Sequence, residues 1–250
     1  MILTLKHRAI YFKNVFSLVK DSLTDVNIKF SVDGMSITGV DPEKISMTHI
    51  VIDKFDHYDC VQPFIFGVSI QYLYKLFRGL PKDATLAITS LRPDSIKLTI
   101  SDPARFRFTI VDLQSIDLPD EDILVPKPNL DSVVVVPTTS LQKIIRELSH
   151  IDTKISISTD SVHSLTFEAN GCLGSATTKI SISDKPVDSI KTFTTYKGSY
   201  FVKFIEKFCK FEVSKDVLLN FTTKGLLWMV YSIEEFGQIY FGLSQIVLSD

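Results

Sequence analysis

Apolar and polar residues alternate along most of the chain, and a period of two places successive side chains on opposite faces of a β-strand. The segments NIKFSV (residues 27–32) and MSITGV (35–40) flank Asp33-Gly34, a pair typical of a tight hairpin turn. The same texture predicts further strands at residues 45–52, 85–90, 95–101, 105–111, 133–137, 154–159, 162–168, 176–182, 216–222, 226–233 and 238–243. The chain is therefore predicted to be mostly β-structure.

Apolar residues at helical spacing occur in four segments: 9–20, 69–79, 138–150 and 199–210. In the first segment the predicted inward face consists of Ile10, Phe12, Val15, Phe16 and Val19. In the last segment it consists of Phe201, Phe204, Ile205 and Phe208. Helices and strands together predict an α+β protein.

The order helix, strands, helix, strands occupies residues 1–112 and recurs over residues 132–246. Spacings agree with a duplication, because Lys143 lies 130 residues after Lys13 and Lys203 lies 128 residues after Lys75. Residues 113–131 between the repeats contain three prolines and five acidic residues, and proline blocks both helix and central strand. We therefore predict two similar domains, residues 1–112 and 132–250, joined by an extended connector at 113–131.

Each predicted helix carries basic residues three, four or seven apart, a spacing that places them on one side of the helix. The four segments hold nine Lys or Arg residues against two acids, which leaves 18 basic and 27 acidic residues elsewhere. The predicted phosphate-facing set is Lys13, Lys20, Lys75, Arg78, Lys143, Arg146, His150, Lys203, Lys207 and Lys210. The overall charge of −2 thus combines two surfaces of opposite sign.

A basic stripe is also compatible with an ordinary solvated face, because every surface helix presents polar residues outward. For a single helix that interpretation is the better one. Ordinary exposed helices mix both signs, however, since opposite charges four residues apart attract and like charges repel. Four stripes that are nearly free of acids favour a surface that faces an anion such as nucleic-acid phosphate.

Composition narrows the class of protein. The pI near 6.2 argues against a protein that grips nucleic acid by its bulk charge, so any such contact must be local. The sequence has no apolar run long enough to span a membrane, and its N-terminus lacks the features of a secretory signal. The cysteines, three and widely spaced, indicate a reducing compartment rather than a disulfide framework.

The sequence offers little catalytic chemistry. It contains no Gly-x-x-x-x-Gly-Lys-Ser/Thr, no Gly-x-Ser-x-Gly and no Cys-x-x-Cys, and its five histidines show no metal-ligand spacing. The densest reactive cluster is Asp56, His57, Asp59 and Cys60, which is either a metal or Cys-His site or, by default, a polar loop whose Cys60 packs inward. We predict a protein that is not an enzyme, with no cofactor and no metal.

Several segments resemble the family of the eukaryotic-type DNA sliding clamp, proliferating cell nuclear antigen, including its viral relatives. The resemblance lies in Asp33-Gly34 followed by VDPEKIS (40–46), in FDHYDC (55–60), GVS (67–69), RELSHI (146–151) and FEANGCLG (167–174). These motifs appear in the family's order and spacing over residues 1–246.

The resemblance implies two similar α+β domains per chain, each with two helices packed on antiparallel sheets, and a homotrimeric ring with the helices lining its hole. In the family the strand before the connector pairs with a strand of the neighbouring subunit, here residues 104–112 with 174–182. The expected interface residues are Phe106, Phe108, Ile110, Thr177 and Lys179.

The function implied is that of a processivity factor that encircles double-stranded DNA without regard to sequence, after delivery by a clamp loader. DNA polymerase and other clients would insert short helical motifs with apolar and aromatic anchors into a groove beneath the connector. Matching groove positions are Val40, Lys44, Met47, Ile116, Leu118, Pro119, Phe241, Gly242, Leu243 and Ser244. Two departures from the family, Gly242-Leu243-Ser244 in place of Leu-Ala-Pro and Lys44 in place of histidine or serine, leave client preference open.

Other interpretations within the same fold are a subunit of a heterotrimeric or checkpoint clamp and a clamp-like viral late transcription factor. The unbroken DPEK and RELSHI segments and the apolar connector favour the processivity factor. The expected location is the nucleus or, for a viral protein, a factory in the cytoplasm of the infected cell.

Overall fold

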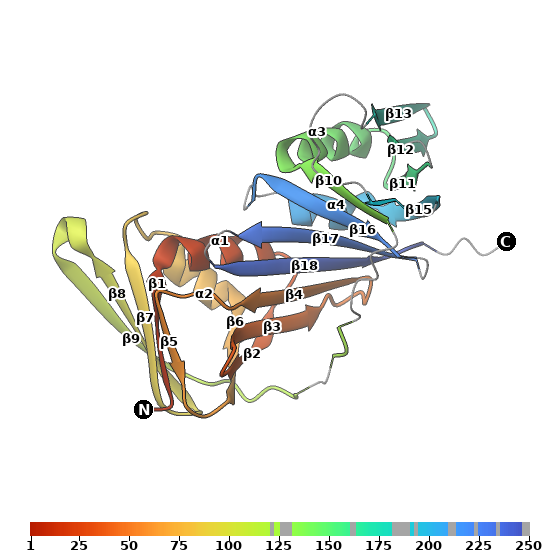
Figure 1. Ribbon diagram of the computed structural model, residues 1–250. Coiled ribbons are helices and arrows are strands. Elements are labelled where there is room, and N and C mark those ends of the chain that lie inside the picture. Colours follow the sequence, from red (N-terminus) through yellow and green to blue (C-terminus); the bar gives the residue numbers. More distant parts are fainter. Residues whose placement is uncertain are drawn as a thin grey trace. The chain divides into compact units, whose positions relative to one another are not determined.

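The computed structural model describes residues 1–120, 123–125, 132–160, 164–181, 191–192, 195–209, 214–222, 225–233 and 236–246 (Figure 1). The chain forms two compact units. Unit 1 comprises Met1–Asp41, Thr48–Val125 and Ile233–Ile239, and unit 2 comprises Pro42–Met47, Pro126–Ser232 and Tyr240–Asp250. Each unit thus contains three separate segments of the chain. The predicted domain boundaries at residues 112 and 132 are not tested by this division and stay a prediction.

Unit 1 begins with the strand–helix pair β1 (Leu3–Arg8) and α1 (Ala9–Val19). The elements that follow are β2 (Asp25–Ser31), β3 (Gly34–Val40), β4 (Ser46–Ile52), β5 (His57–Cys60), β6 (Phe64–Ser69), α2 (Ile70–Phe77), β7 (Thr85–Arg92), β8 (Ser95–Asp102), the 3-10 helix η1 (Pro103–Arg105) and β9 (Arg107–Gln114). One antiparallel sheet has the order β5-β1-β7-β8-β9, and β2 pairs with both β3 and β6 in another.

Unit 2 repeats this plan. The second half of the chain forms β10 (Ser132–Pro137), α3 (Thr138–Ser149), β11 (Lys154–Thr159), β12 (Ser164–Gly171), β13 (Gly174–Ser181), β14 (Lys191–Thr192), β15 (Tyr196–Phe201), α4 (Val202–Cys209), β16 (Asp216–Phe221), β17 (Leu226–Ile233) and β18 (Gly237–Ser244). Residues 237–239 of β18 are grouped with unit 1, and residues 46–47 of β4 are grouped with unit 2. One sheet has the order β13-β12-β11-β15, and β10 pairs with both β14 and β16.

The order of elements confirms the predicted internal repeat. β1 lies between β5 and β7 just as β10 lies between β14 and β16, and β2 between β3 and β6 corresponds to β11 between β12 and β15. The repeat extends to the segments that leave the last strands. The Ile116 amide donates to the Gly67 carbonyl at 2.9 Å, and the Ile246 amide donates to the Ser199 carbonyl at 2.8 Å.

The predicted hairpin around Asp33-Gly34 forms, with Ser31 opposite Gly34 in the β2–β3 register. Gly34 has φ of +139°, and a Cβ there would lie 2.3 Å from the Ile52 carbonyl oxygen. Only glycine satisfies both the backbone angle and the close approach. The sequence prediction did not include β1, β5, β6, β14 and β15, although Leu3, Leu5 and His7 of β1 alternate and are buried.

Four α-helices occur in the described residues, in the predicted places, and each buries one apolar face. In α1 the predicted residues Phe12, Val15, Phe16 and Val19 are buried, whereas Ile10 is half-exposed. In α4 the predicted Phe204, Ile205 and Phe208 are buried, whereas Phe201 ends β15 and is half-exposed. Among the described residues no helix has the length and apolarity needed to cross a membrane.

The start of β9 differs from the prediction of a strand over residues 105–111. Pro103 is the first residue of η1, since its fixed φ suits the first turn of a helix, and β9 begins only at Arg107. Phe106, between them, adopts φ of +51°, a left-handed conformation that is strained for a bulky residue. Its side chain is 98% exposed.

Candidate nucleic-acid interface

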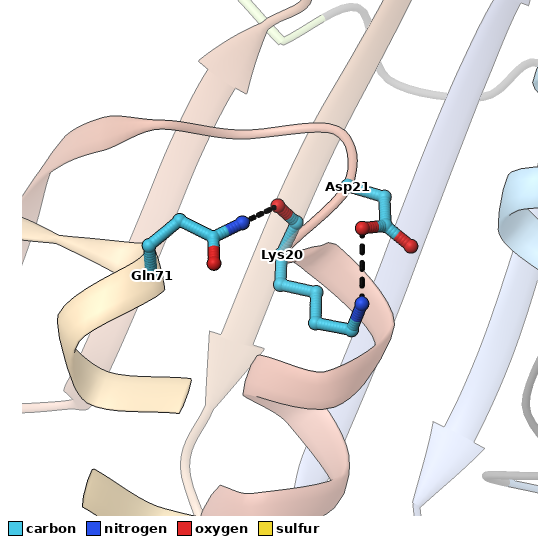
Figure 2. Close-up of polar contacts among 3 residues, drawn as sticks. All are labelled: Lys20, Asp21 and Gln71. Atoms are coloured by element: carbon cyan, nitrogen blue, oxygen red, sulfur yellow. Dashed lines mark hydrogen bonds and ion pairs between the residues drawn. The ribbon is translucent and has the colours of Figure 1, made fainter. Parts of the chain in front are cut away.

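In unit 1, α1 and α2 pack together and are tied at one end by a side chain. The Gln71 amide Nε2, at the start of α2, donates to the Lys20 carbonyl at 2.7 Å (Figure 2). Lys20 is the C-cap of α1, where carbonyls lack intrahelical donors, so Gln71 satisfies one of them. This contact links the end of α1 to the start of α2, the two helices that carry the basic stripes of unit 1.

The two basic residues of α1 are held by neighbours. Lys20 Nζ lies 3.0 Å from Asp21 Oδ1 (Figure 2). The same Nζ lies 5.0 Å from the centre of the Tyr74 ring, and the Lys20 side chain is only 18% exposed. Lys13 Nζ donates to the Leu80 carbonyl at 3.3 Å. Both lysines must give up or share these contacts before they can bind an external phosphate.

The basic residues of α2 are free to solvent. Lys75 and Arg78 are exposed, and neither forms an ion pair with another residue in the described part of the chain. Lys75 also lies in the last turn of its helix and Arg78 is the C-cap. An anion can therefore bind the basic residues of α2 without displacing an ion-pair partner.

In unit 2, α3 and α4 form the equivalent pair, and the Gln142 amide Nε2 donates to the Cys209 carbonyl at 2.5 Å. Between them lies a groove that brings together three of the predicted basic residues. It is lined by Gln142, Ile145, Arg146, Lys203, Glu206, Lys207 and Cys209. Burial raises the pKa of the Cys209 thiol to about 12, so this cysteine adds no negative charge to the groove at neutral pH.

Acidic side chains accompany the basic residues of unit 2. Lys203 Nζ donates to both carboxylate oxygens of Glu43, at 2.8 and 2.7 Å, and Lys143 Nζ lies 4.0 Å from Glu147 Oε1. Lys207 Nζ lies 5.4 Å from the centre of the Phe204 ring. His150 is the exposed C-cap of α3, and Lys210 lies outside the described residues.

The prediction from the sequence did not include two acidic residues that contact the basic surface, Asp21 and Glu43. Asp21 follows Lys20 directly, so its proximity was readable in the sequence, although it falls one residue beyond the predicted helix. Glu43 is separated from Lys203 by 160 residues, and no local pattern indicates that pair. The helices are nearly free of acids, as predicted, but the surface around them is not.

The predicted client-groove residues have varied exposure. Val40 and Ile116 are exposed, Met47 and Leu118 are half-exposed, and Lys44 is exposed with φ of +58°. The C-terminal segment is different, because Phe241 and Leu243 are fully buried in unit 2, where Phe241 stacks on Phe208 at 4.1 Å. Gly242 is buried against Trp228. Of the four predicted groove residues at 241–244, only Ser244 therefore has an exposed side chain.

The connector is fastened to unit 1. The Gly67 amide donates to Ser115 Oγ at 2.9 Å, Asn27 Nδ2 donates to the Pro119 carbonyl at 3.0 Å, and Lys29 Nζ lies 2.9 Å from Asp120 Oδ1. A Cβ at position 67 would lie 2.0 Å from the Ile116 carbonyl oxygen, so glycine is required there. These contacts hold the described connector residues 115–120 against β6 and β2.

The predicted interface residues lie on two sheet edges. Phe106, Phe108 and Ile110 are 98%, 69% and 52% exposed at β9, which is the last strand of its sheet. Thr177 and Lys179 are exposed on β13, also a last strand. An apolar groove of unit 2 opens beside β13, and it is lined in part by Val136, Ile144, Leu165, Thr178 and Ile180.

The cluster at residues 56–60 is not the loop that was predicted, because His57–Cys60 form β5 and pair with β1. Cys60 does pack inward, as predicted, and burial raises the pKa of its thiol. No three His, Cys, Asp or Glu residues in the described ranges are grouped closely enough to hold a metal ion.

Comparison with known proteins supports the two-unit organisation. The family model of the proliferating cell nuclear antigen N-terminal domain matches residues 2–122, and that of the C-terminal domain matches residues 124–246. Together they span nearly the whole α+β chain. The chain belongs to the proliferating cell nuclear antigen family.

Similar proteins come from viruses and from eukaryotes. A probable DNA polymerase sliding clamp of Paramecium bursaria Chlorella virus 1 is 26% identical over 244 residues, covering 94% of this chain and 93% of the relative. Proliferating cell nuclear antigen of Dictyostelium discoideum is 24% identical over 248 residues, covering 95% and 96%. Proliferating cell nuclear antigen 2 of Drosophila melanogaster is 22% identical over 241 residues, covering 95% and 94%.

Proposed function

We propose that this protein is a DNA sliding clamp, a ring that encircles duplex DNA and tethers a DNA polymerase and other proteins to it. The observation that carries this proposal is the convergence of Arg146, Lys203 and Lys207 on one groove between α3 and α4. Lys75 and Arg78 on α2 provide an equivalent exposed basic surface in unit 1. The names of the similar proteins support the same conclusion.

The chemistry of these residues fits a protein that moves along DNA. Lysine and arginine bind phosphate oxygens, which recur along every duplex and carry no direct sequence information. A closed ring keeps the protein on DNA by topology, so each contact can be weak and exchangeable. This role is non-catalytic and needs neither a metal nor a cofactor.

Ring closure would use the exposed edges β9 and β13. An unpaired edge presents a row of backbone donors and acceptors, and pairing with another copy removes this liability. Phe106, Phe108 and Ile110 of one copy would cover the apolar groove beside β13 of the next. We propose a homotrimer, in keeping with the family resemblance, loaded onto DNA by a clamp loader.

Clients would bind beside the connector through short helical motifs with apolar and aromatic anchors. Val40, Ile116 and Leu118 of unit 1 offer apolar surface for these anchors. Replacing Ile116 and Leu118 with alanine should weaken a client peptide by about tenfold, as expected for two shortened apolar contacts. Calorimetry with the variant would measure this, and unchanged affinity would reject the groove. The expected location is the nucleus or a viral factory.

The clamp function can be tested by topology. The protein is allowed to thread onto a linear duplex, whose ends are then blocked with streptavidin or left open. Retention on the blocked duplex in moderate salt, with rapid loss from the open one, is the expected result. The charge variant K75Q/R78Q/R146Q/K207Q should thread poorly while keeping its thermal stability. Equal dissociation of the wild-type protein from blocked and open duplexes would contradict the proposal.

A further inference from the structure

The most specific polar contact of the basic surface is an ion pair within unit 2. Glu43, in the turn between β3 and β4, accepts from Lys203 Nζ with both carboxylate oxygens, at 2.8 and 2.7 Å. The side chains are 52% and 54% exposed, so water and ions reach both of them. Surface ion pairs of this exposure contribute little to stability and exchange readily with other partners.

The position of this pair gives it a second role. Lys203 lines the same groove as Arg146 and Lys207, where the proposed function places DNA phosphate. A carboxylate with two oxygens on one ammonium group resembles a phosphate that offers two of its oxygens. The Glu43 carboxylate therefore occupies the place on Lys203 that a DNA phosphate would take.

We propose that Glu43 is an intramolecular substitute for DNA phosphate. Its carboxylate competes with DNA for Lys203, which weakens the contact between Lys203 and a DNA phosphate and makes that contact exchange faster. This inference rests on the proposed clamp function and goes beyond it. When a phosphate leaves, Lys203 returns to Glu43 at once instead of standing uncompensated. The cost of releasing each phosphate falls, and the protein moves more easily to the next one.

Unit 1 contains a pair that looks similar but should act differently. Lys20 is bonded to Asp21 and lies over the Tyr74 ring, and its side chain is 18% exposed. A phosphate would have to displace both partners, and part of the lysine would stay covered. Lys20 is therefore a fixed part of the α1–α2 surface, whereas Lys203 is an exchangeable one.

The test is the affinity of the full-length protein for a short fluorescent duplex, measured by anisotropy over a series of salt concentrations. Glu43→Gln should bind about threefold more tightly at low salt, and the salt dependence of log K should steepen by about 0.9, because Lys203 would neutralise one more DNA phosphate. On a long end-blocked duplex, single-molecule tracking should show that this variant diffuses more slowly than the wild-type protein.

Glu206→Gln is the matched control. Glu206 lines the same groove and is exposed, but it has no ion pair in the described part of the chain. Its replacement removes the same charge without releasing a lysine. A double-mutant cycle with Lys203→Met separates the direct effect further, because Glu43→Gln should have no larger effect than Glu206→Gln once Lys203 is absent.

Equal affinities for Glu43→Gln and Glu206→Gln, or an undiminished effect of Glu43→Gln in the Lys203→Met background, would overturn the substitute role and leave the clamp function standing. Failure of the wild-type protein to bind the duplex at low salt would overturn both. A steeper salt dependence that appears only with Lys203 present would establish the competition.

Discussion

The two helix pairs have the same fold and the same number of described cations, yet they offer these cations differently. Unit 1 holds Lys13 and Lys20 by a carbonyl, a carboxylate and an aromatic ring, and exposes Lys75 and Arg78. Unit 2 gathers Arg146, Lys203 and Lys207 in a groove that also contains Glu206. A stripe of lysines in a sequence therefore overstates the charge available to a ligand, because part of it is already neutralised at short range.

The units also differ at the edges of their sheets. Substitutions at these edges should have the largest effect of those considered, and they should act on assembly. Unit 1 presents apolar side chains at β9, and unit 2 presents the groove beside β13. The variant F106D/F108D should raise the dissociation constant of the assembly at least about a hundredfold, since burying two aromatic side chains contributes roughly 1.5–3 kcal/mol each. Analytical ultracentrifugation would show monomers at concentrations where the wild-type protein assembles.

Val32→Asp is the control for that experiment, because Val32 is 66% exposed in the turn between β2 and β3, which belong to a different sheet from β9 and from β13. It should leave the assembly intact. An F106D/F108D protein that sediments like the wild type would place the interface elsewhere.

A second experiment compares the exposed and the held cations of unit 1. K75Q/R78Q should lower duplex affinity by about tenfold at low salt and reduce the salt dependence of log K by roughly 0.9 for each phosphate that is no longer neutralised. K13Q/K20Q should lower the affinity less, by about twofold, since these side chains are already engaged. Anisotropy titrations at several salt concentrations would measure both.

Urea unfolding supplies the complementary measurement on the same variants. K13Q/K20Q should reduce the free energy of unfolding by about 1 kcal/mol, because it removes a cation–π contact and packed side-chain stems. K75Q/R78Q should leave it unchanged. The reverse pattern would mean that Lys75 and Arg78, and not Lys13 and Lys20, are the basic residues that stabilise unit 1.

The last comparison concerns the glutamines that tie each helix pair, where the difference between the two units should be small. Gln71→Ala exposes the Lys20 carbonyl to water, whereas Gln142→Ala leaves the Cys209 carbonyl in a partly buried place. An unsatisfied buried acceptor costs more than one that water reaches, so Gln142→Ala should destabilise by about 1–2 kcal/mol and Gln71→Ala by less than about 1 kcal/mol. Thermal unfolding of the two variants would measure both losses of stability. Equal losses would contradict the expectation and show that the two carbonyls are equally hydrated.

Much of the fold was predictable because its signals are local. The hairpin at Asp33-Gly34, the helices, the repeat of their order and their basic residues all follow from spacing along the chain. Strands such as β6 were missed because the sequence of Phe64–Ser69 is nearly continuous in apolar character, although Ile65 is exposed in the structure. Alternation fails as a signal where an apolar residue also occupies the exposed face of a strand.

The sequence by itself determined the period of each element, the apolar face it buries and the cations it carries, since these depend on neighbours a few residues apart. Only the tertiary structure decided which cations are accessible. Glu43 reaches Lys203 across 160 residues, Phe241 turns into the core of unit 2, and Phe106 projects into solvent from a left-handed turn. The physical reason is that electrostatic and packing interactions depend on the distance between residues in space. Folding brings residues close together that are far apart along the chain, and the sequence spacing does not reveal which ones.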